Sequence, residues 1–77
     1  MSPDKLRYQV NQIATFFASQ PEHEQVEGVA DHINKFWDPR MRAKLFEISD
    51  ESTEGFKPMV VAALVKINRP AGVGSTG

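Results

Sequence analysis

Apolar side chains recur at helical spacing near the start of the chain. The first set follows at intervals of four, three and four residues: Leu6, Val10, Ile13 and Phe17. This spacing is typical of one apolar stripe on an amphipathic helix. Ser2 is a favourable N-cap and Pro3 a favourable first helical residue. The pattern therefore predicts a helix over residues 3–19.

A second set of apolar residues predicts a helix over residues 21–36. Its members again suit one helical face: Val26, Val29, Ala30, Ile33 and either Phe36 or Trp37. Pro21 ends the first helix and opens the second, whose first turns carry glutamates that favour the positive end of the helix dipole. Gly28 weakens this helix by up to about 1 kcal/mol relative to alanine. We expect its benefit to be a close approach between two helices.

The third and fourth helices are predicted to start at proline. Asp38-Pro39 stops the second helix, because a residue before proline avoids helical backbone, and it caps a helix over residues 39–48. A polar loop, residues 50–55, follows and is expected to be solvated. Lys57-Pro58 starts a helix over residues 58–68.

The fourth predicted helix is apolar on nearly every face between Met59 and Val65. Such a helix is buried from several sides, and we do not expect the other helices of so small a chain to cover it fully. It is either an ordinary core helix or one that docks in part on a partner.

These elements predict an all-α fold, a compact bundle of three to four short helices. Residues 1–68 form the single domain, and the Pro/Gly-rich residues 69–77 are expected to be a flexible, disordered tail. The predicted core is Leu6, Val10, Ile13, Phe17, Val29, Ile33, Phe36, Leu45, Val60 and Leu64.

Composition narrows the classes of function. The 77 residues include no cysteine, which excludes disulfides and thiolate metal sites. The net charge of −1, from 9 basic and 10 acidic residues, argues against nucleic acid as the main partner. The longest apolar run is far shorter than the roughly 20 residues that span a bilayer. The polar N-terminus lacks the features of a signal peptide, so we expect no membrane and a cytoplasmic location.

No catalytic chemistry is recognisable. The serines and threonines lie in no nucleophile motif. His23 and His32 lie nine residues apart on one predicted helix, about 13 Å apart along its axis and on roughly opposite faces. They cannot share a metal ion within this chain. We therefore expect no catalytic, cofactor-binding or metal-binding residues, and a protein that is not itself an enzyme.

Residues 36–42 form the most distinctive stretch and supply the candidate partner-binding residues: Trp37, Asp38, Arg40 and Arg42. Tryptophan and arginine are the residues most enriched at interface hot spots. Alternatively, Trp37 fills the corner between two helices and the arginines are solvated. A small nucleic-acid patch is a third interpretation. Because exposed charges contribute little to stability, we expect substitution of both arginines to leave folding nearly unchanged.

His32 is the remaining candidate for partner binding. It is either a half-buried helix residue that hydrogen-bonds near Trp37, or a partner contact, or, as a third interpretation, a metal ligand.

Several of these segments resemble one known family. They are Asn11-Gln12-Ile13, Phe16-Phe17, Ala30-Asp31-His32-Ile33, Phe36-Trp37-Asp38-Pro39-Arg40-Met41-Arg42 and Lys57-Pro58-Met59-Val60. Together they resemble the small delta subunit of cytosolic NAD-dependent formate dehydrogenases, from about Leu6 to about Ile67. The string from Phe36 to Arg42 is the specific part. Residues 46–55 and the tail lie outside the resemblance.

The resemblance implies an accessory component of a multisubunit enzyme. In such enzymes the catalytic alpha subunit carries a molybdenum or tungsten bis-pterin guanine dinucleotide cofactor and iron–sulfur clusters, and formate oxidation passes electrons to NAD. The delta subunit would hold no redox centre. It would bind the alpha subunit and support assembly, cofactor insertion or stability. The alternative is a free-standing helical module that binds an unrelated protein or forms a homo-oligomer when isolated.

Overall fold

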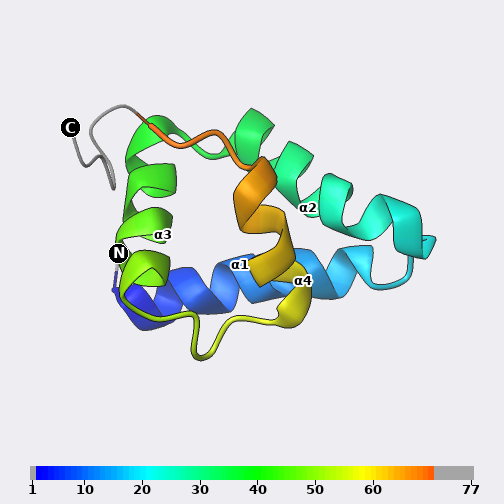
Figure 1. Ribbon diagram of the computed structural model, residues 1–77, viewed down its shortest axis with the longest axis horizontal. Helices are drawn as coiled ribbons and strands as arrows, with labels where there is room; N and C mark the ends of the chain where they lie inside the picture. Colours follow the sequence, from blue (N-terminus) through cyan, green and yellow to red (C-terminus); the bar gives the residue numbers. More distant parts are fainter. Residues whose placement is uncertain (1, 71–77) are drawn as a thin grey trace.

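The computed structural model describes residues 2–70 of the chain. Within these residues it contains four α-helices, one 3-10 helix and no β-strand (Figure 1). The helices are α1 (Pro3–Phe17), α2 (Glu22–Phe36), α3 (Pro39–Glu51), α4 (Pro58–Ala63) and the 3-10 helix η1 (Leu64–Lys66). The all-α prediction is therefore confirmed.

The four α-helices enclose one core. α1 and α2 form a hairpin, and α3 runs from the end of α2 back to the start of α1 (Figure 1). α4 packs against both α1 and α2, so it lies inside the frame that the other helices make. The C-terminal segment then runs past α2 and contacts it through η1.

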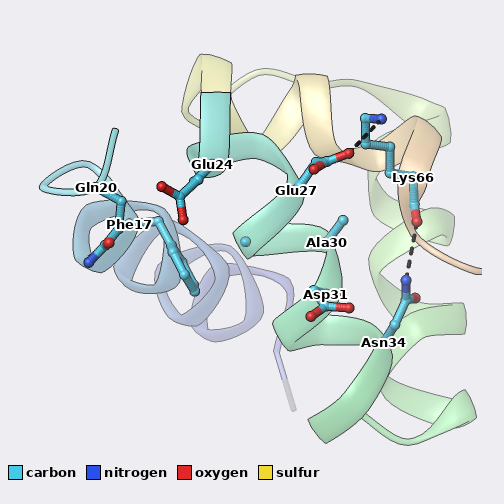
Figure 2. A pocket seen from close by; sticks show the side chains of 9 residues that line it. Phe17, Gln20, Glu24, Glu27, Ala30, Asp31, Asn34 and Lys66 are labelled. Atoms are coloured by element: carbon cyan, nitrogen blue, oxygen red, sulfur yellow. Dashed lines mark hydrogen bonds and ion pairs between the residues drawn. The ribbon is translucent and has the colours of Figure 1, made fainter. Parts of the chain in front are cut away.

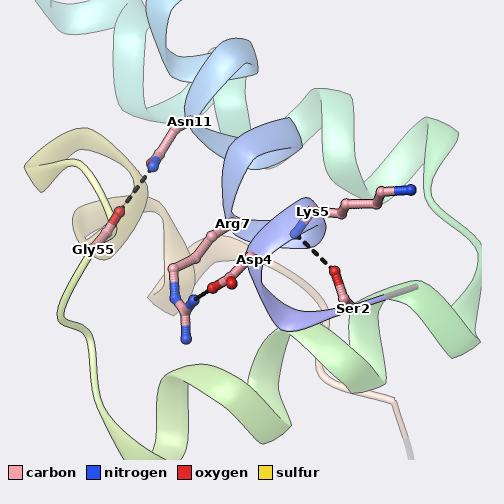
Figure 3. Close-up of polar contacts among 6 residues, drawn as sticks. All are labelled: Ser2, Asp4, Lys5, Arg7, Asn11 and Gly55. Carbon is pink, nitrogen blue, oxygen red and sulfur yellow. Dashed lines mark hydrogen bonds and ion pairs between the residues drawn. The ribbon is translucent and has the colours of Figure 1, made fainter.

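The predicted starts of α1, α3 and α4 are correct, because local capping and proline determine them. Ser2 Oγ accepts a hydrogen bond from the backbone N–H of Lys5 at 3.2 Å (Figure 3). Asp38 Oδ1 accepts one from the backbone N–H of Met41 at 2.8 Å. These oxygens satisfy backbone donors that have no partner within the helix. α4 starts at Pro58, as expected.

The predicted helix ends are less accurate. α1 stops at Phe17 rather than at residue 19, and α2 begins one residue after the predicted start, with Pro21 as its N-cap. α3 continues to Glu51 instead of ending at residue 48, because its last turns pack on the core through Ile48 and Ser49, both buried.

The predicted helix over residues 58–68 is also too long. Its α-helical part ends at Ala63, η1 follows to Lys66, and Ile67 has extended backbone. The reason is a tertiary contact. Asn34 of α2 hydrogen-bonds the backbone carbonyl of Lys66 and the backbone N–H of Asn68, which holds this stretch extended.

The core is largely the predicted one. Six of the predicted residues are fully buried: Leu6, Val10, Val29, Ile33, Leu45 and Val60. Three more are partly buried and pack against them: Ile13, Phe17 and Leu64. Phe36 was predicted wrongly, because its side chain is 72% exposed. α2 ends at Phe36, and Trp37 leaves the helix in extended backbone and takes the buried position, at 7% exposure.

Gly28 has the predicted role of allowing a close approach. A Cβ atom at this position would lie 2.5 Å from Cδ1 of Phe17, much less than a van der Waals contact. Phe17 of α1 therefore crosses α2 where α2 has no side chain, which explains why a helix-weakening residue stands in the middle of α2.

The first residues of the predicted tail contact α3. Arg69 donates two hydrogen bonds to the carboxylate of Asp50, at 2.9 and 3.1 Å, and its guanidinium lies 4.1 Å from the centre of the Phe46 ring. Residues 71–77 lie outside the described part of the chain, as does the prediction of a flexible tail for them.

Candidate functional site

Three of the seven aromatic side chains are mainly exposed. Tyr8 is 65% exposed, Phe16 66% and Phe36 72%. Contact between water and apolar surface of this size is unfavourable. Scattered apolar residues are ordinary on a protein surface, whereas contiguous ones mark interaction sites. The arrangement of these rings therefore decides whether they mark an interaction site.

Four rings form a continuous series that we call the aromatic strip: Phe16, Phe17, His32 and Phe36. Phe16 and Phe17 meet edge to face, with ring centres 5.1 Å apart. Phe17 and His32 are also edge to face at 6.4 Å, and His32 and Phe36 are tilted at 4.8 Å. The strip runs from the end of α1 to the end of α2, with its two outer phenylalanines exposed.

The helix period and the α1–α2 turn build this strip. Gly28, His32 and Phe36 are spaced by four residues, so they follow one another along one side of α2. The turn between the helices brings the end of α1 beside them, and Gly28 admits the Phe17 ring. Two consecutive phenylalanines cannot both face the core from one helix, which leaves Phe16 outside.

A shallow hollow with acidic side chains borders the strip (Figure 2). Its volume is about 570 Å³, with Phe17 on one side and Lys66 on the other. Glu24, Glu27 and Asp31 project from α2 between them (Figure 2). Phe17 belongs both to the hollow and to the aromatic strip, so the two make one continuous surface.

The carboxylates of this surface are exposed and only weakly paired. Glu27 lies 3.6 Å from Lys66, and Asp31 lies 3.2 Å from Lys35. Glu24 lies 3.6 Å from His23, a pair that is ionic only when the histidine is protonated. α2 as a whole carries four carboxylates and one lysine, hence a net charge of −3 with neutral histidines. The surface is therefore both aromatic and acidic.

A second, more apolar hollow lies between α1, α2 and α4. Its volume is about 650 Å³, and its apolar lining includes Ala14, Ala18, Val26, Met59 and Ala62.

The expectation that the last helix is incompletely covered is confirmed, because Val65 of η1 is 88% exposed whereas Val60 and Ala63 are buried.

Most of the residues predicted to bind a partner have structural contacts at the α2–α3 corner. Trp37 is buried in the core, and Asp38 caps α3. Arg42 donates hydrogen bonds to the carbonyl of Trp37 at 3.3 Å and to the carbonyl of Asn68 at 2.7 Å. Arg40 is exposed. These contacts favour the structural interpretation of this stretch, although they leave Arg40 available to a partner.

His32 is the predicted site residue that lies in the aromatic strip, where it contacts Phe17 and Phe36. The sequence pattern predicts both phenylalanines in the core, so it does not predict the strip. The signal that could have revealed it is the Phe16-Phe17 pair at the end of an amphipathic helix, together with Phe36 next to the larger Trp37.

Two kinds of feature are absent from the described residues. Among residues 2–70, no group of three or more His, Cys, Asp or Glu side chains is arranged to hold a metal ion. None of the helices in that part of the chain has the length and apolar character needed to cross a bilayer.

Near the C-terminal end of α3, the Arg69 guanidinium hydrogen-bonds Asp50 and holds the pKa of that carboxyl below its ordinary value.

Comparison with known proteins identifies the family. Residues 5–64 match the family described as NADH-dependent formate dehydrogenase delta subunit FdsD. The chain belongs to this family. The matched residues cover α2, α3, α4 and all of α1 except its first two residues. They therefore include the whole aromatic strip and the α2–α3 corner of this delta-subunit chain. Comparisons with curated proteins and with solved structures gave no match.

Proposed function

We propose that this chain is a non-catalytic accessory subunit of a cytoplasmic, NAD-dependent formate dehydrogenase that contains molybdenum or tungsten. The observation that carries the proposal is the delta-subunit match, which extends over residues 5–64 and thus over nearly all of the described chain. The chain binds the catalytic alpha subunit and supports assembly, cofactor insertion or stability of the complex.

Two features of the surface support a binding role. The aromatic strip leaves Phe16 and Phe36 largely exposed, and a partner that covers them removes apolar surface from water. The two helices that present the strip, α1 and α2, have 15 residues each and rest on one well-buried core. A rigid helical face of this kind can bind without a large ordering cost.

The proposal is tested in the native host by deleting the gene for this chain. We expect the deletion strain to lose NAD-coupled formate oxidation and the purified enzyme to contain less molybdenum or tungsten, with both restored by the full chain. Tagged full chain should co-elute with the large catalytic subunit. Normal formate oxidation and normal metal content in the deletion strain, without co-elution, would contradict the proposal.

A second candidate function is a free-standing helical module that self-associates. The observation in its favour is the exposure of apolar side chains on two separate elements, with Phe36 on α2 and Val65 on η1. Light scattering on the isolated chain distinguishes the two functions. A stable homo-oligomer that captures no dehydrogenase subunit from the host would favour the module.

A further inference from the structure

The exposed side of the α1–α2 hairpin joins an apolar and a charged surface. The outer rings, Phe16 and Phe36, are more than 60% exposed, and the ring contacts from Phe16 to Phe36 leave no polar residue other than His32 within the series. Next to it, the side chains of Glu24, Glu27 and Asp31 are 56%, 71% and 65% exposed. Aromatic anchors beside a charged rim are the arrangement found at protein interfaces.

The charge of this face limits what can cover it. The charged residues that line the hollow are three carboxylates and one lysine, a net charge of −2, whereas the whole chain has only −1. A second copy that packed through the same face would place carboxylates against carboxylates, since a two-fold interface brings like patches together. A nucleic acid or an anionic membrane would be repelled for the same reason. The complementary occupant carries basic side chains.

The ion pairs on α2 are compatible with such an occupant. Glu27 and Asp31 contact Lys66 and Lys35, but these pairs are largely exposed and such pairs are weak. A basic side chain from a partner can share these carboxylates, and an adjacent apolar side chain can cover Phe17 and its neighbours. An arginine over Phe16 or Phe36 would gain a cation–π contact as well.

We propose that the aromatic strip and the acidic hollow dock a segment of the catalytic subunit that presents lysine or arginine beside an apolar side chain. The proposal rests on the proposed function, because it takes the catalytic subunit as the partner. It places the main contact on α1 and α2 and not at the buried Trp37 corner.

The test uses tagged full-length variants expressed in the deletion strain, with the catalytic subunit that co-elutes measured by mass spectrometry. The first variant, Phe16→Ala with Phe36→Ala, removes the exposed rings and leaves the buried core intact. The second, Glu27→Lys with Asp31→Lys, reverses the charge of the acidic hollow. Circular dichroism and thermal unfolding show whether each variant folds.

Each variant has a matched control. Val65→Ala removes an exposed apolar side chain on η1, away from the α1–α2 face. Glu47→Lys with Glu51→Lys makes the same change in net charge, at the same four-residue spacing, on exposed positions of α3. We expect both strip and hollow variants to reduce recovery of the catalytic subunit at least about tenfold, with the controls unchanged.

The remaining outcomes separate this inference from the proposed function. If the wild-type chain recovers the catalytic subunit and the strip and hollow variants recover it equally well, the docking face is wrong and the accessory role stands. If only the charge reversal has no effect, the basic occupant is wrong. Failure of the wild-type chain to recover the subunit overturns both. A homodimer of the isolated chain that Phe16→Ala with Phe36→Ala disperses would assign the face to a second copy.

Discussion

Asn11 and Asn34 hold the two ends of one segment, residues 55–68. Each side-chain amide donates one hydrogen bond to the backbone there and accepts one from it. Asn11 donates from Nδ2 to the carbonyl of Gly55 at 2.8 Å (Figure 3) and accepts at Oδ1 from the backbone N–H of Lys57 at 2.9 Å. The residue between these two, Phe56, is buried. One amide thus satisfies the backbone on both sides of a core residue.

Asn34 repeats this arrangement at the other end of the segment. Its Nδ2 donates to the carbonyl of Lys66 at 3.1 Å, and its Oδ1 accepts from the backbone N–H of Asn68 at 2.7 Å. Ile67, between them, is 5% exposed. The amide of asparagine offers a donor and an acceptor side by side, so asparagine suits both positions. The hydrogen bonds of Asn11 fix the backbone just before α4, and those of Asn34 fix the backbone at the end of η1.

Replacing either asparagine with alanine should therefore destabilise the fold. Asn11→Ala and Asn34→Ala each leave one carbonyl and one N–H without their partner, and we expect the free energy of unfolding to fall by about 1–3 kcal/mol. Urea unfolding followed by circular dichroism measures this. The control is Asn68→Ala, which keeps the backbone N–H that Asn34 binds. Wild-type stability in Asn34→Ala would show that water replaces these bonds at no cost.

Gly28→Ala is expected to destabilise the protein, although alanine is the better helix former. Alanine improves helix propensity by about 1 kcal/mol. The new Cβ would meet the Phe17 ring at 2.5 Å, and overpacking of this kind costs about 1–3 kcal/mol. In a Phe17→Ala background the clash is gone, so Gly28→Ala should then stabilise. Unfolding free energies of the four proteins in this double-mutant cycle measure the coupling; equal effects of Gly28→Ala in both backgrounds would contradict it.

The two arginines at the α2–α3 corner should differ. From the sequence, both substitutions were expected to be neutral, but Arg42 hydrogen-bonds the carbonyls of Trp37 and Asn68. We expect Arg42→Ala to lower the free energy of unfolding by about 1–2 kcal/mol. Arg40→Ala should remain within about 0.5 kcal/mol of the wild type, because its side chain is exposed. Thermal and urea unfolding test the difference, and equal midpoints for both variants would contradict it.

The Asp50–Arg69 pair should make stability sensitive to acid. Arg69 hydrogen-bonds the Asp50 carboxylate and lowers its pKa below the ordinary value of 3.8. Because the pKa is lower in the folded state, the pair stabilises the protein above the unfolded-state pKa. This stabilisation is lost as the pH falls through the folded-state pKa. We expect the melting temperature of the wild type to exceed that of Asp50→Asn at neutral pH, with the difference shrinking below about pH 4.

Glu51→Gln is the control for that experiment, since it removes a neighbouring exposed carboxylate from α3. Melting curves by circular dichroism across the acid range give the comparison. A constant difference between the wild type and Asp50→Asn, down to the lowest pH measured, would mean that protonation of this carboxyl does not contribute.

Much of the fold was predictable because it depends on residues close together in the chain. Ser2 and Asp38 each cap the helix that follows them, and Pro58 starts α4 where the sequence places it. The predicted core also included the six largest of the fully buried side chains. Capping and amphipathic spacing act over three or four residues, so they can be read without the rest of the structure.

The helix ends and the exposed aromatic face depended on tertiary contacts. Asn34 is 32 residues from Lys66, yet it ends the last helix by binding the backbone there. Phe36 and Trp37 are adjacent and both apolar, and only the extended backbone after α2 puts Trp37 in the core and Phe36 outside. The sequence by itself determined the helices and most of their buried faces. Which aromatic rings remain exposed was decided by how the helices pack, because a change of one residue at a helix end turns a side chain from the core to the solvent.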